Sequence, residues 1–270
     1  MGILLNACLV ACAGSLQFAN RFVVEETDIH VLILPPGTLL KSYAPEHPDS
    51  IPADSIRGPG DPRALFVNEV VDSVFIDQFM SSLKYHLDLF QVKAYGPDQM
   101  DQFFALDQPA YIFVLAQIEL LEYVDEEVFM GRSGVNRYIG RVDITVLENN
   151  VWWEFAKLHD AGFGMEVLFN AHATSDHVEG RFIRLSTGQV RFQPQKYLLT
   201  EEDVSDLAYF SGRQNAQNIF DHLMNIYVRK QSGREYPYYF HYDIEEHVIR
   251  EREYPPFIRI EPRNDSPDED

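Results

Sequence analysis

The sequence predicts an α/β protein of the α+β kind, with a mixed β-sheet covered by helices mainly on one face and a long C-terminal helix. Strand and helix patterns follow the order β, α, β, α, then a run of β, then a long α, which is typical of a sheet with helices gathered on one side. Composition agrees, because 46% of the 270 residues are hydrophobic and 13% are aromatic, enough to bury a sizeable core.

The first part of the chain predicts a buried strand, a loop and a helix. Residues 31–34 form a continuous apolar run that ends at two prolines and a glycine, as a central strand does before a turn. Residues 44–62 are rich in proline and are expected to be a loop. Asp72 and Ser73 predict a helix N-cap, and apolar residues spaced by three and four continue that helix to residue 90.

The middle of the chain predicts a series of strands. Residues 110–124 are the longest candidate, and the polar residues 125–137 are expected to be a connection to the next strand. Alternation at 142–146 predicts a half-exposed strand, which resumes at 151–158 after a bulge at Asn149 and Asn150. The pattern then turns and alternates again from Met165, which predicts a hairpin.

A long helix and one further strand are predicted in the last part. Thr200 and Asp203 form a helix-capping pair, and an apolar face continues from Val204 to Tyr227. Alternation at 238–244 then predicts a single added strand. The expected organisation is a signal and lipobox segment at 1–12, a leader at 13–28, one α/β domain at 29–230, an aromatic-rich extension at 231–260 and a disordered acidic tail at 261–270.

The charge balance excludes some classes of partner. There are 22 Lys and Arg against 42 Asp and Glu, a formal net charge of −20. This argues against nonspecific binding to nucleic acid and against adsorption to anionic lipid through a basic face. The sequence contains no run of 18 or more apolar residues, so it predicts no membrane-spanning helix.

Both cysteines lie near the N-terminus, so no internal disulfide and no thiolate zinc site are expected in the rest of the chain. Leu9-Val10-Ala11-Cys12 resembles a bacterial lipobox, in which the cysteine is acylated and becomes the mature N-terminus. Cys8, preceded by Asn6 and Ala7, is a poorer alternative. Because the first basic residue is Arg21, we expect the true start of the signal to lie upstream of Met1.

Five segments of the chain form a recognisable set: the lipobox cysteine, Val31-Leu32-Ile33-Leu34-Pro35-Pro36 with Lys41, Asp72-Ser73-Val74-Phe75, Ala110-Tyr111-Ile112-Phe113 and Trp152-Trp153-Glu154-Phe155. Together they resemble a family of uncharacterised outer-membrane lipoproteins of Bacteroidetes-type bacteria. The expected topology is also similar to the TolB N-terminal domain and to curli-secretion and penicillin-binding-protein activator lipoproteins. No acidic residue follows Cys12 before Glu25, which by resemblance to lipoprotein sorting rules favours the outer membrane facing the periplasm. The family resemblance spans residues 9–230 and implies an accessory or assembly role in the envelope. It supplies no catalytic residues.

Candidate site residues are few. His172 and His177, with Asp176 and Glu179, are weak candidates for a metal site, although their spacing matches no established one. No cofactor is predicted, because the phosphate-cradling, zinc-protease and nucleophile-elbow motifs are missing from the sequence. A second polar cluster, also considered as a metal site, is formed by His241, Asp243, Glu245, Glu246 and His247.

Aromatic residues supply the other candidates. Tyr238, Phe240 and Tyr242 are candidates for docking a partner or a glycan, because aromatic rings offer a large contact area. One of Trp152 and Trp153 is expected in the core, since neighbouring strand residues point to opposite faces. Glu119 and Glu122 are expected to be solvated, unlike the paired carboxylates of a glycosidase.

The sequence therefore predicts a non-enzymatic lipoprotein, anchored in the membrane through acyl chains on Cys12, that supports an envelope complex through a protein partner it does not identify. Three alternatives stay open. They are a periplasmic module that binds a small ligand or glycan, an enzyme whose site is assembled from distant residues, and a cytoplasmic protein with no signal. A deep pocket with titratable groups favours the enzyme, and an exposed aromatic groove favours the binding module.

Overall fold

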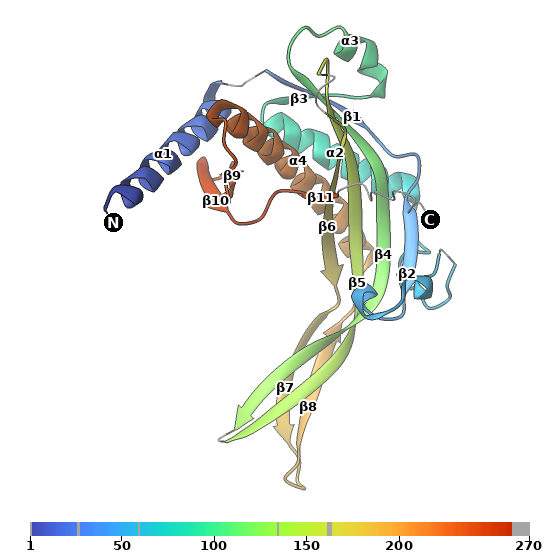
Figure 1. The fold of residues 1–270 in the computed structure, drawn as a ribbon. Coiled ribbons are helices and arrows are strands. Elements are labelled where there is room, and N and C mark those ends of the chain that lie inside the picture. The colour runs from blue at the N-terminus through green and yellow to red at the C-terminus, as the bar shows by residue number, and fades with distance from the viewer. Residues whose placement is uncertain (1, 26–27, 59, 134, 161–163, 261–270) are drawn as a thin grey trace, which may run out of the picture.

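The computed structural model describes residues 2–25, 28–58, 60–133, 135–160 and 164–260, with only the backbone for residues 2–13 and for Ser133. The predicted fold class is confirmed. A mixed sheet is covered on one face by helices, and the long helix α4 (Glu201–Ser232) comes late in the chain (Figure 1). The acidic tail at 261–270 lies outside the described residues.

The sheet is organised around β4 (Ala110–Ser133), its longest strand. Two strands run parallel to β4 along one edge, β1 (Ile29–Leu34) beside its beginning and β2 (Leu40–Ala44) further along. β3 (Val92–Tyr95) adds to the far side of β1, also in parallel. The continuous apolar run of β1 fits this central position, because strands buried on both faces carry few polar residues.

Antiparallel strands complete the sheet on the other edge of β4. β5 (Asn136–Lys157), β6 (Glu166–Ser175) and β11 (Ile258–Ile260) follow one another outward. β5 is continuous, so the predicted bulge at Asn149 and Asn150 is wrong. The register shift lies on β4 instead, between Leu115 and Gln117.

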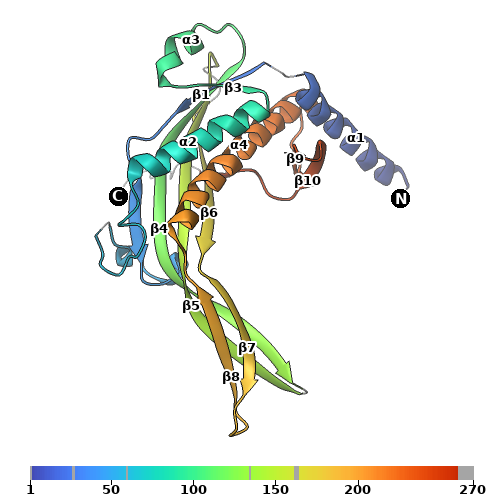
Figure 2. The same ribbon diagram turned by 180° about the vertical axis from the view of Figure 1, so that it is seen from behind.

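Two helices, α2 (Asp72–Leu89) and α4, lie side by side on one face of the sheet (Figures 1 and 2). α2 begins at Asp72 with Val71 as its N-cap, so the predicted cap at Asp72 and Ser73 is displaced. α4 begins as predicted, because the Thr200 hydroxyl accepts a hydrogen bond from the Asp203 amide, and it ends at Gly233 with φ of 62°. Glycine adopts this left-handed conformation without a steric penalty.

The main core lies between these helices and the sheet. Trp153 is fully buried there, 6.4 Å from the Phe79 ring and 6.1 Å from the Phe113 ring. Its indole Nε1 donates a hydrogen bond of 2.7 Å to Oδ1 of Asn215 on α4. Trp152 is only half-buried on the opposite face, so the expectation of one core tryptophan is confirmed.

α1 (Gly2–Glu25) joins the same core through its second half. Ala19 and Phe22 are buried, and the Phe22 ring lies 5.5 Å from the rings of Phe220 and Tyr227 on α4. The segment expected to be a leader is thus helical to Glu25 and packs on the body. Among the described residues, no helix meets the length and hydropathy needed to cross a membrane.

Shorter elements cover the ends of the other sheet face. Phe103 of α3 (Met100–Phe104), which follows the short helix η3 (Pro97–Gln99), packs with Leu32, Tyr95 and Ala110. The predicted loop at 44–62 holds the short helices η1 (Pro48–Ser50) and η2 (Ala53–Ser55) and covers a second small cluster. That cluster is made of Ala44, Leu121, Tyr123 and Val146.

Glu122 is a buried carboxylate and corrects the expectation that it is solvated. It is 1% exposed and accepts hydrogen bonds of 2.6, 2.8 and 3.0 Å from the amides of Leu65, Phe66 and Val67. These donors compensate the desolvation of the charge, which is the condition for burying it. Glu119, on the opposite face, accepts a hydrogen bond from the Ser42 hydroxyl.

β4 and β5 continue well past the body as a long hairpin, which contradicts the predicted connection at 125–137. The two strands stay paired from Tyr123 and Val146 out to Ser133 and Asn136. Their side chains are largely solvated there, which gave the segment its polar, loop-like composition. Tertiary pairing therefore decides the strand where the hydrophobic pattern is weak.

A second hairpin, absent from the sequence-based prediction, packs against the first. β7 (His177–Arg184) and β8 (Val190–Tyr197) lie beside the extended parts of β4 and β5 (Figures 1 and 2). Between the two hairpins, the Phe192 ring lies 4.6 Å from Phe129 and 5.1 Å from Phe182, and Tyr138 lies 6.1 Å from Phe182. We call residues 124–145 and 177–197 the arm.

Replacing Gly140 with alanine is expected to loosen the arm. A Cβ at Gly140 lies 2.4 Å from the Phe192 ring, so the aromatic contact between the hairpins has to move. Overpacking of this kind costs about 1–3 kcal/mol, whereas glycine to alanine in an unobstructed strand gains stability. Urea unfolding measures the change. Gly37→Ala, with no atom within 4 Å of its added Cβ, is the control, and an equal effect of both variants contradicts the packing role.

The C-terminal part forms a two-stranded ribbon of β9 (Tyr239–Asp243) and β10 (Val248–Arg252). β9 confirms the predicted strand. The aromatic-rich extension is part of the main core, because Phe240 and Phe257 are 1% and 3% exposed within it. The ribbon thereby lies next to α4, where the candidate site is found.

Candidate functional site

A cleft of about 400 Å³ lies between the ribbon, the middle of α4 and the end of α2. This volume falls within the range of small-molecule binding pockets, roughly 300–1,000 Å³. Its lining combines charged groups, side-chain amides and aromatic rings. The polar members are His86, Arg213, Gln214, Gln217, Asn218, Asp221, His241, Asp243, Glu245 and Arg252, and the aromatic members include Phe90, Tyr239 and Tyr254.

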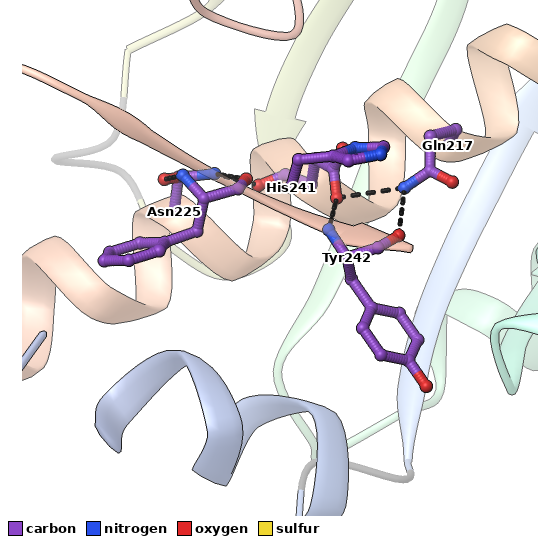
Figure 3. A network of polar contacts seen from close by, with 6 residues as sticks. Gln217, Asn225, His241 and Tyr242 are labelled. Atoms are coloured by element: carbon purple, nitrogen blue, oxygen red, sulfur yellow. Dashed lines mark hydrogen bonds and ion pairs between the residues drawn. The ribbon is translucent and has the colours of Figure 1, made fainter. Parts of the chain in front are cut away.

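The ribbon wall of the cleft is fixed by a ladder of α4 side chains (Figure 3). Gln217, Asp221 and Asn225 are spaced by four residues and so lie along one face of the helix. Asn225 bonds both the amide and the carbonyl of Phe240, at 2.9 and 2.8 Å. At Tyr242, Asp221 accepts from the amide and Gln217 donates to the carbonyl, each at 3.0 Å. The three side chains thus take the place of a neighbouring strand.

Asp221 and His241 form a paired group on the cleft wall. Nδ1 of His241 lies 2.7 Å from Oδ2 of Asp221, and their side chains are 16% and 5% exposed. Burial raises the pKa of the Asp221 carboxyl, although the hydrogen bonds from His241, the Tyr242 amide and Gln217 act in the opposite direction. Both carboxyl oxygens are therefore occupied by contacts within the chain.

The mouth of the cleft carries opposite charges and exposed rings. Arg213 of α4 reaches Glu245 of the ribbon turn at 3.3 Å, and Asp243 lies 3.5 Å from Arg250. The acidic lining residues Asp221, Asp243 and Glu245 each have a basic partner, whereas Arg252 forms no ion pair among the described residues. Tyr254 is 78% exposed beside this cation and offers an open aromatic face.

The aromatic docking candidates lie around this site with different exposures. Phe240 is buried in the core, so its side chain is not available to a partner in this conformation. Tyr238 is half-buried and its hydroxyl lies 3.2 Å from Ser15 of α1. Tyr242 packs on Phe90 and Phe220, and its hydroxyl lies 3.0 Å from Nδ1 of His247. The exposed aromatic contributor is Tyr254, which the sequence reasoning did not single out.

The weak metal candidates are not brought together. His172 on β6 is packed against Phe210, and burial lowers its pKa to about 4. His177, at the start of the arm, stacks on Tyr197. Asp176 between them accepts hydrogen bonds from the amides of Thr145 and Leu199. Within the part of the chain that the structure describes, no group of three or more His, Cys, Asp or Glu side chains is arranged to hold a metal ion.

The second polar cluster forms the turn of the ribbon. Asp243 accepts hydrogen bonds of 3.1 Å from the amides of Glu245 and Glu246, which lowers its pKa. His247 continues the turn with φ of 54°. These residues therefore shape the turn, and Asp243 and Glu245 line the cleft together with His241.

Cys12 and Cys8 lie in the first half of α1, where the structure describes only the backbone. The packed part of the helix follows directly, because Ser15 is fully buried. In Figure 1 the first half of α1 projects away from the body. Cys12 thus lies three residues before Ser15, where the described side chains of α1 pack on the body.

The residues that build the cleft were mostly missed from the sequence, since they come from helices and a ribbon far apart in the chain. One usable signal was present. Gln217, Asp221 and Asn225 repeat every four residues among the apolar residues Ile219, Phe220 and Leu223, where a purely hydrophobic stripe was expected. Hydrogen-bonding side chains at that spacing on a packed face point to a polar partner beneath them.

Comparison with known proteins gives little that is close. No protein-family model and no curated protein matches the chain. Among solved structures, a homolog of neuraminyllactose-binding hemagglutinin from Helicobacter pylori is similar at 9% identity, with a TM-score of 0.26, over 78% of this chain and 92% of that chain. A similarity this remote carries no argument about function, which has to come from the site itself.

Proposed function

We propose that this chain is a non-enzymatic lipoprotein of the bacterial cell envelope, an accessory binding module that takes a short acidic saccharide in its cleft. The observation that carries the proposal is the composition of the cleft wall. Side-chain amides of Gln214 and Asn218 suit hydroxyl groups, and the open ring of Tyr254 suits the apolar face of a sugar. Arg252, which forms no ion pair among the described residues, suits a carboxylate.

The same geometry favours binding over catalysis. In the Asp221–His241 pair, the carboxylate binds His241 and the Tyr242 amide and so holds the ribbon in place. This structural role explains why the carboxylate is buried, and no catalytic role is needed to explain it. The cleft is also preorganised, because the α4 ladder holds its wall through backbone groups. Preorganisation reduces the entropy lost on binding and so favours affinity.

The membrane anchor is the second part of the proposal. Acylation at Cys12 would attach the lipid three residues before Ser15, the first of the described side chains of α1 that is buried. A tether this short keeps the body close to the bilayer, on the periplasmic face of the outer membrane. Acyl chains then supply the membrane contact, since several together anchor a protein stably.

Binding in the cleft is tested by titrating the full chain with glucose, N-acetylglucosamine and glucuronic acid, followed by saturation-transfer NMR. Glucuronic acid is expected to bind best, because a charge-assisted hydrogen bond to Arg252 is worth about tenfold in affinity over a neutral contact. Arg252→Gln removes that preference, and Tyr254→Ala weakens all three sugars. Tyr197→Ala, an exposed ring on the arm, is the control. Equal binding by every variant, or none by the wild type, refutes the site.

The anchor is tested separately by intact-mass analysis and acyl labelling of the chain expressed in its native cell. Cys12→Ala is expected to abolish cleavage and label, whereas Cys8→Ala leaves both unchanged. An unlabelled wild-type chain in the soluble fraction contradicts the anchor and returns the choice to a cytoplasmic binding protein.

A further inference from the structure

The charge of the chain is strongly divided between the end of the arm and everything else. Residues 128–141 and 180–194, which we call the arm tip, contain no Asp or Glu and six arginines: Arg132, Arg137, Arg141, Arg181, Arg184 and Arg191. Because the chain has 22 Lys and Arg, the remaining residues hold 16 of them against all 42 Asp and Glu. A cationic tip is therefore carried by a very acidic body.

The outward face of β4 and β5 at the tip combines these arginines with exposed aliphatic side chains. Phe129 points inward to Phe192, so its neighbours on β4 point outward. The outward pairs are Val128 with Arg141, Met130 with Ile139 and Arg132 with Arg137. Met130 is 84% exposed, Ile139 is 62% exposed, and Val135 at the turn is 94% exposed.

These features lower the stability of the arm, so a purely structural role does not explain them. Two arginines directly opposite each other on paired strands repel and destabilise the hairpin. Among the described residues, Arg137, Arg181, Arg184 and Arg191 form no ion pair, whereas Arg141 lies 2.7 Å from the carboxylate of Glu126. Large aliphatic side chains in full contact with water add to the cost. Together they indicate a surface suited to a partner that offers anionic groups next to an apolar region.

The acidic body does not cancel the field of the tip. Beyond Glu127, the last acidic residue of β4, the strand continues to Ser133, about 20 Å at ~3.3 Å per residue. Charges are screened over about 8 Å at physiological ionic strength. The exclusion of anionic lipid drawn from the net charge therefore applies to the body and does not extend to the tip.

We propose that the arm tip docks onto an anionic lipid bilayer, with its aliphatic side chains in the interface and its arginines on the headgroup phosphates. Arginine binds phosphate through two parallel hydrogen bonds, and apolar side chains flanked by cations are the usual composition of interfacial segments. Figures 1 and 2 show the arm and the free end of α1 projecting to the same side of the body. One membrane surface can therefore meet both, although the docking does not require acylation of Cys12.

A protein surface is the less favourable occupant. A stable protein interface buries about 800 Å² on each partner, usually around a concave or flat patch. The tip is instead a narrow end with its most exposed aliphatic residues at the turn and beside it. A convex apolar end is suited to insertion between lipid headgroups. The acidic body of a second copy is the competing anionic surface, and the experiment separates the two.

The test uses the full chain with Cys8→Ala and Cys12→Ala, so that no acyl chain contributes. Its co-sedimentation is measured with vesicles of phosphatidylcholine alone and with vesicles in which phosphatidylglycerol replaces part of it. We expect binding only to the anionic vesicles, weakened by salt. Arg132→Gln with Arg137→Gln is expected to reduce partitioning about thirty-fold, since each basic residue near the surface contributes about fivefold. Lys230→Gln with Arg234→Gln, two exposed cations outside the arm, is the matched control.

Insertion is tested with Val135→Trp and lipids whose acyl chains carry bromine. Quenching of the added fluorescence on anionic vesicles is expected. Without quenching, the tip is held by charge alone and the insertion is refuted.

Three results overturn the proposal. Equal binding to neutral vesicles refutes the role of the arginines. An equal loss in the control variant shows that another face binds. Failure to bind vesicles, together with self-association that Arg132→Gln and Arg137→Gln abolish, assigns the tip to the acidic body of a second copy. Each outcome is independent of saccharide binding in the cleft.

Discussion

Asp221→Ala is expected to lower the free energy of unfolding by about 3–5 kcal/mol and to release the ribbon from α4. The carboxylate accepts from the Tyr242 amide, Gln217 and His241, and its side chain is 5% exposed. Removing it leaves a buried amide and an imidazole without their partner, and unsatisfied buried groups carry the full cost of desolvation. Urea unfolding measures the loss, and limited proteolysis between β9 and β10 reports the release.

The matched control is Asp206→Ala, an exposed aspartate on the same helix. It changes helix charge and propensity in the same way but breaks no contact with the ribbon, so its effect stays within a few tenths of a kcal/mol. Asp221→Asn keeps one acceptor oxygen and is expected to fall between the two. If Asp221→Ala unfolds at the same urea concentration as the control, the α4 ladder does not hold the ribbon, and the cleft wall is not preformed.

Acid is expected to destabilise the protein through His222, and this loss begins at a pH well above the range in which carboxylates titrate. Burial lowers the pKa of His222 to about 3, and the nearby cations Arg229 and Arg259 act in the same direction. In the unfolded chain the imidazole has its ordinary pKa near ~6.5 and binds a proton first. Stability is therefore lost as pH falls below that value. At about pH 4 the loss from this group is about 3 kcal/mol relative to neutral pH.

The variant His222→Phe is expected to remove most of this acid sensitivity. The ring already lies 4.9 Å from Phe155 and 5.9 Å from Phe257, so an apolar ring fits the site. His172, whose pKa burial also lowers, keeps a smaller slope in the variant. Thermal unfolding from neutral to acidic pH gives the comparison, with His177→Phe, whose side chain is 70% exposed, as control. An unchanged acid slope in His222→Phe contradicts the assignment.

Sequence patterns predicted the parts of the fold in which one segment decides its own structure. The apolar run of β1, the spacing of α2 and the Thr200 cap of α4 each express a local rule, and all three elements are present. The fold class followed from their order. These features depend on burial of a stripe or a face, which a single segment records.

The arm and the cleft depend instead on contacts between distant segments. The distal part of β4 reads as a polar loop because its only packed residues, such as Phe129, alternate with solvated ones. Gly140 and Gly180 make room for the Phe192 ring, a contact between hairpins that neither segment records alone. In the cleft, Arg213 and Arg252 meet only after α4 and the ribbon have packed. Contacts of this kind produce no periodic pattern of apolar residues in the sequence. In such segments the tertiary contacts determine the secondary structure more strongly than the intrinsic strand propensity does.

The α4 ladder has a consequence for how this protein tolerates change. Gln217 and Asn225 recognise the amides and carbonyls of β9, which every residue except proline supplies alike. The outward side chains of the ribbon, Tyr239 among them, are consequently free to vary without loosening the wall on which they stand. We therefore expect substitutions of the outward side chains in β9 to be tolerated better than substitutions of Gln217 or Asn225 in α4. Relatives with the same scaffold can therefore acquire different ligand preferences through substitutions in the ribbon alone.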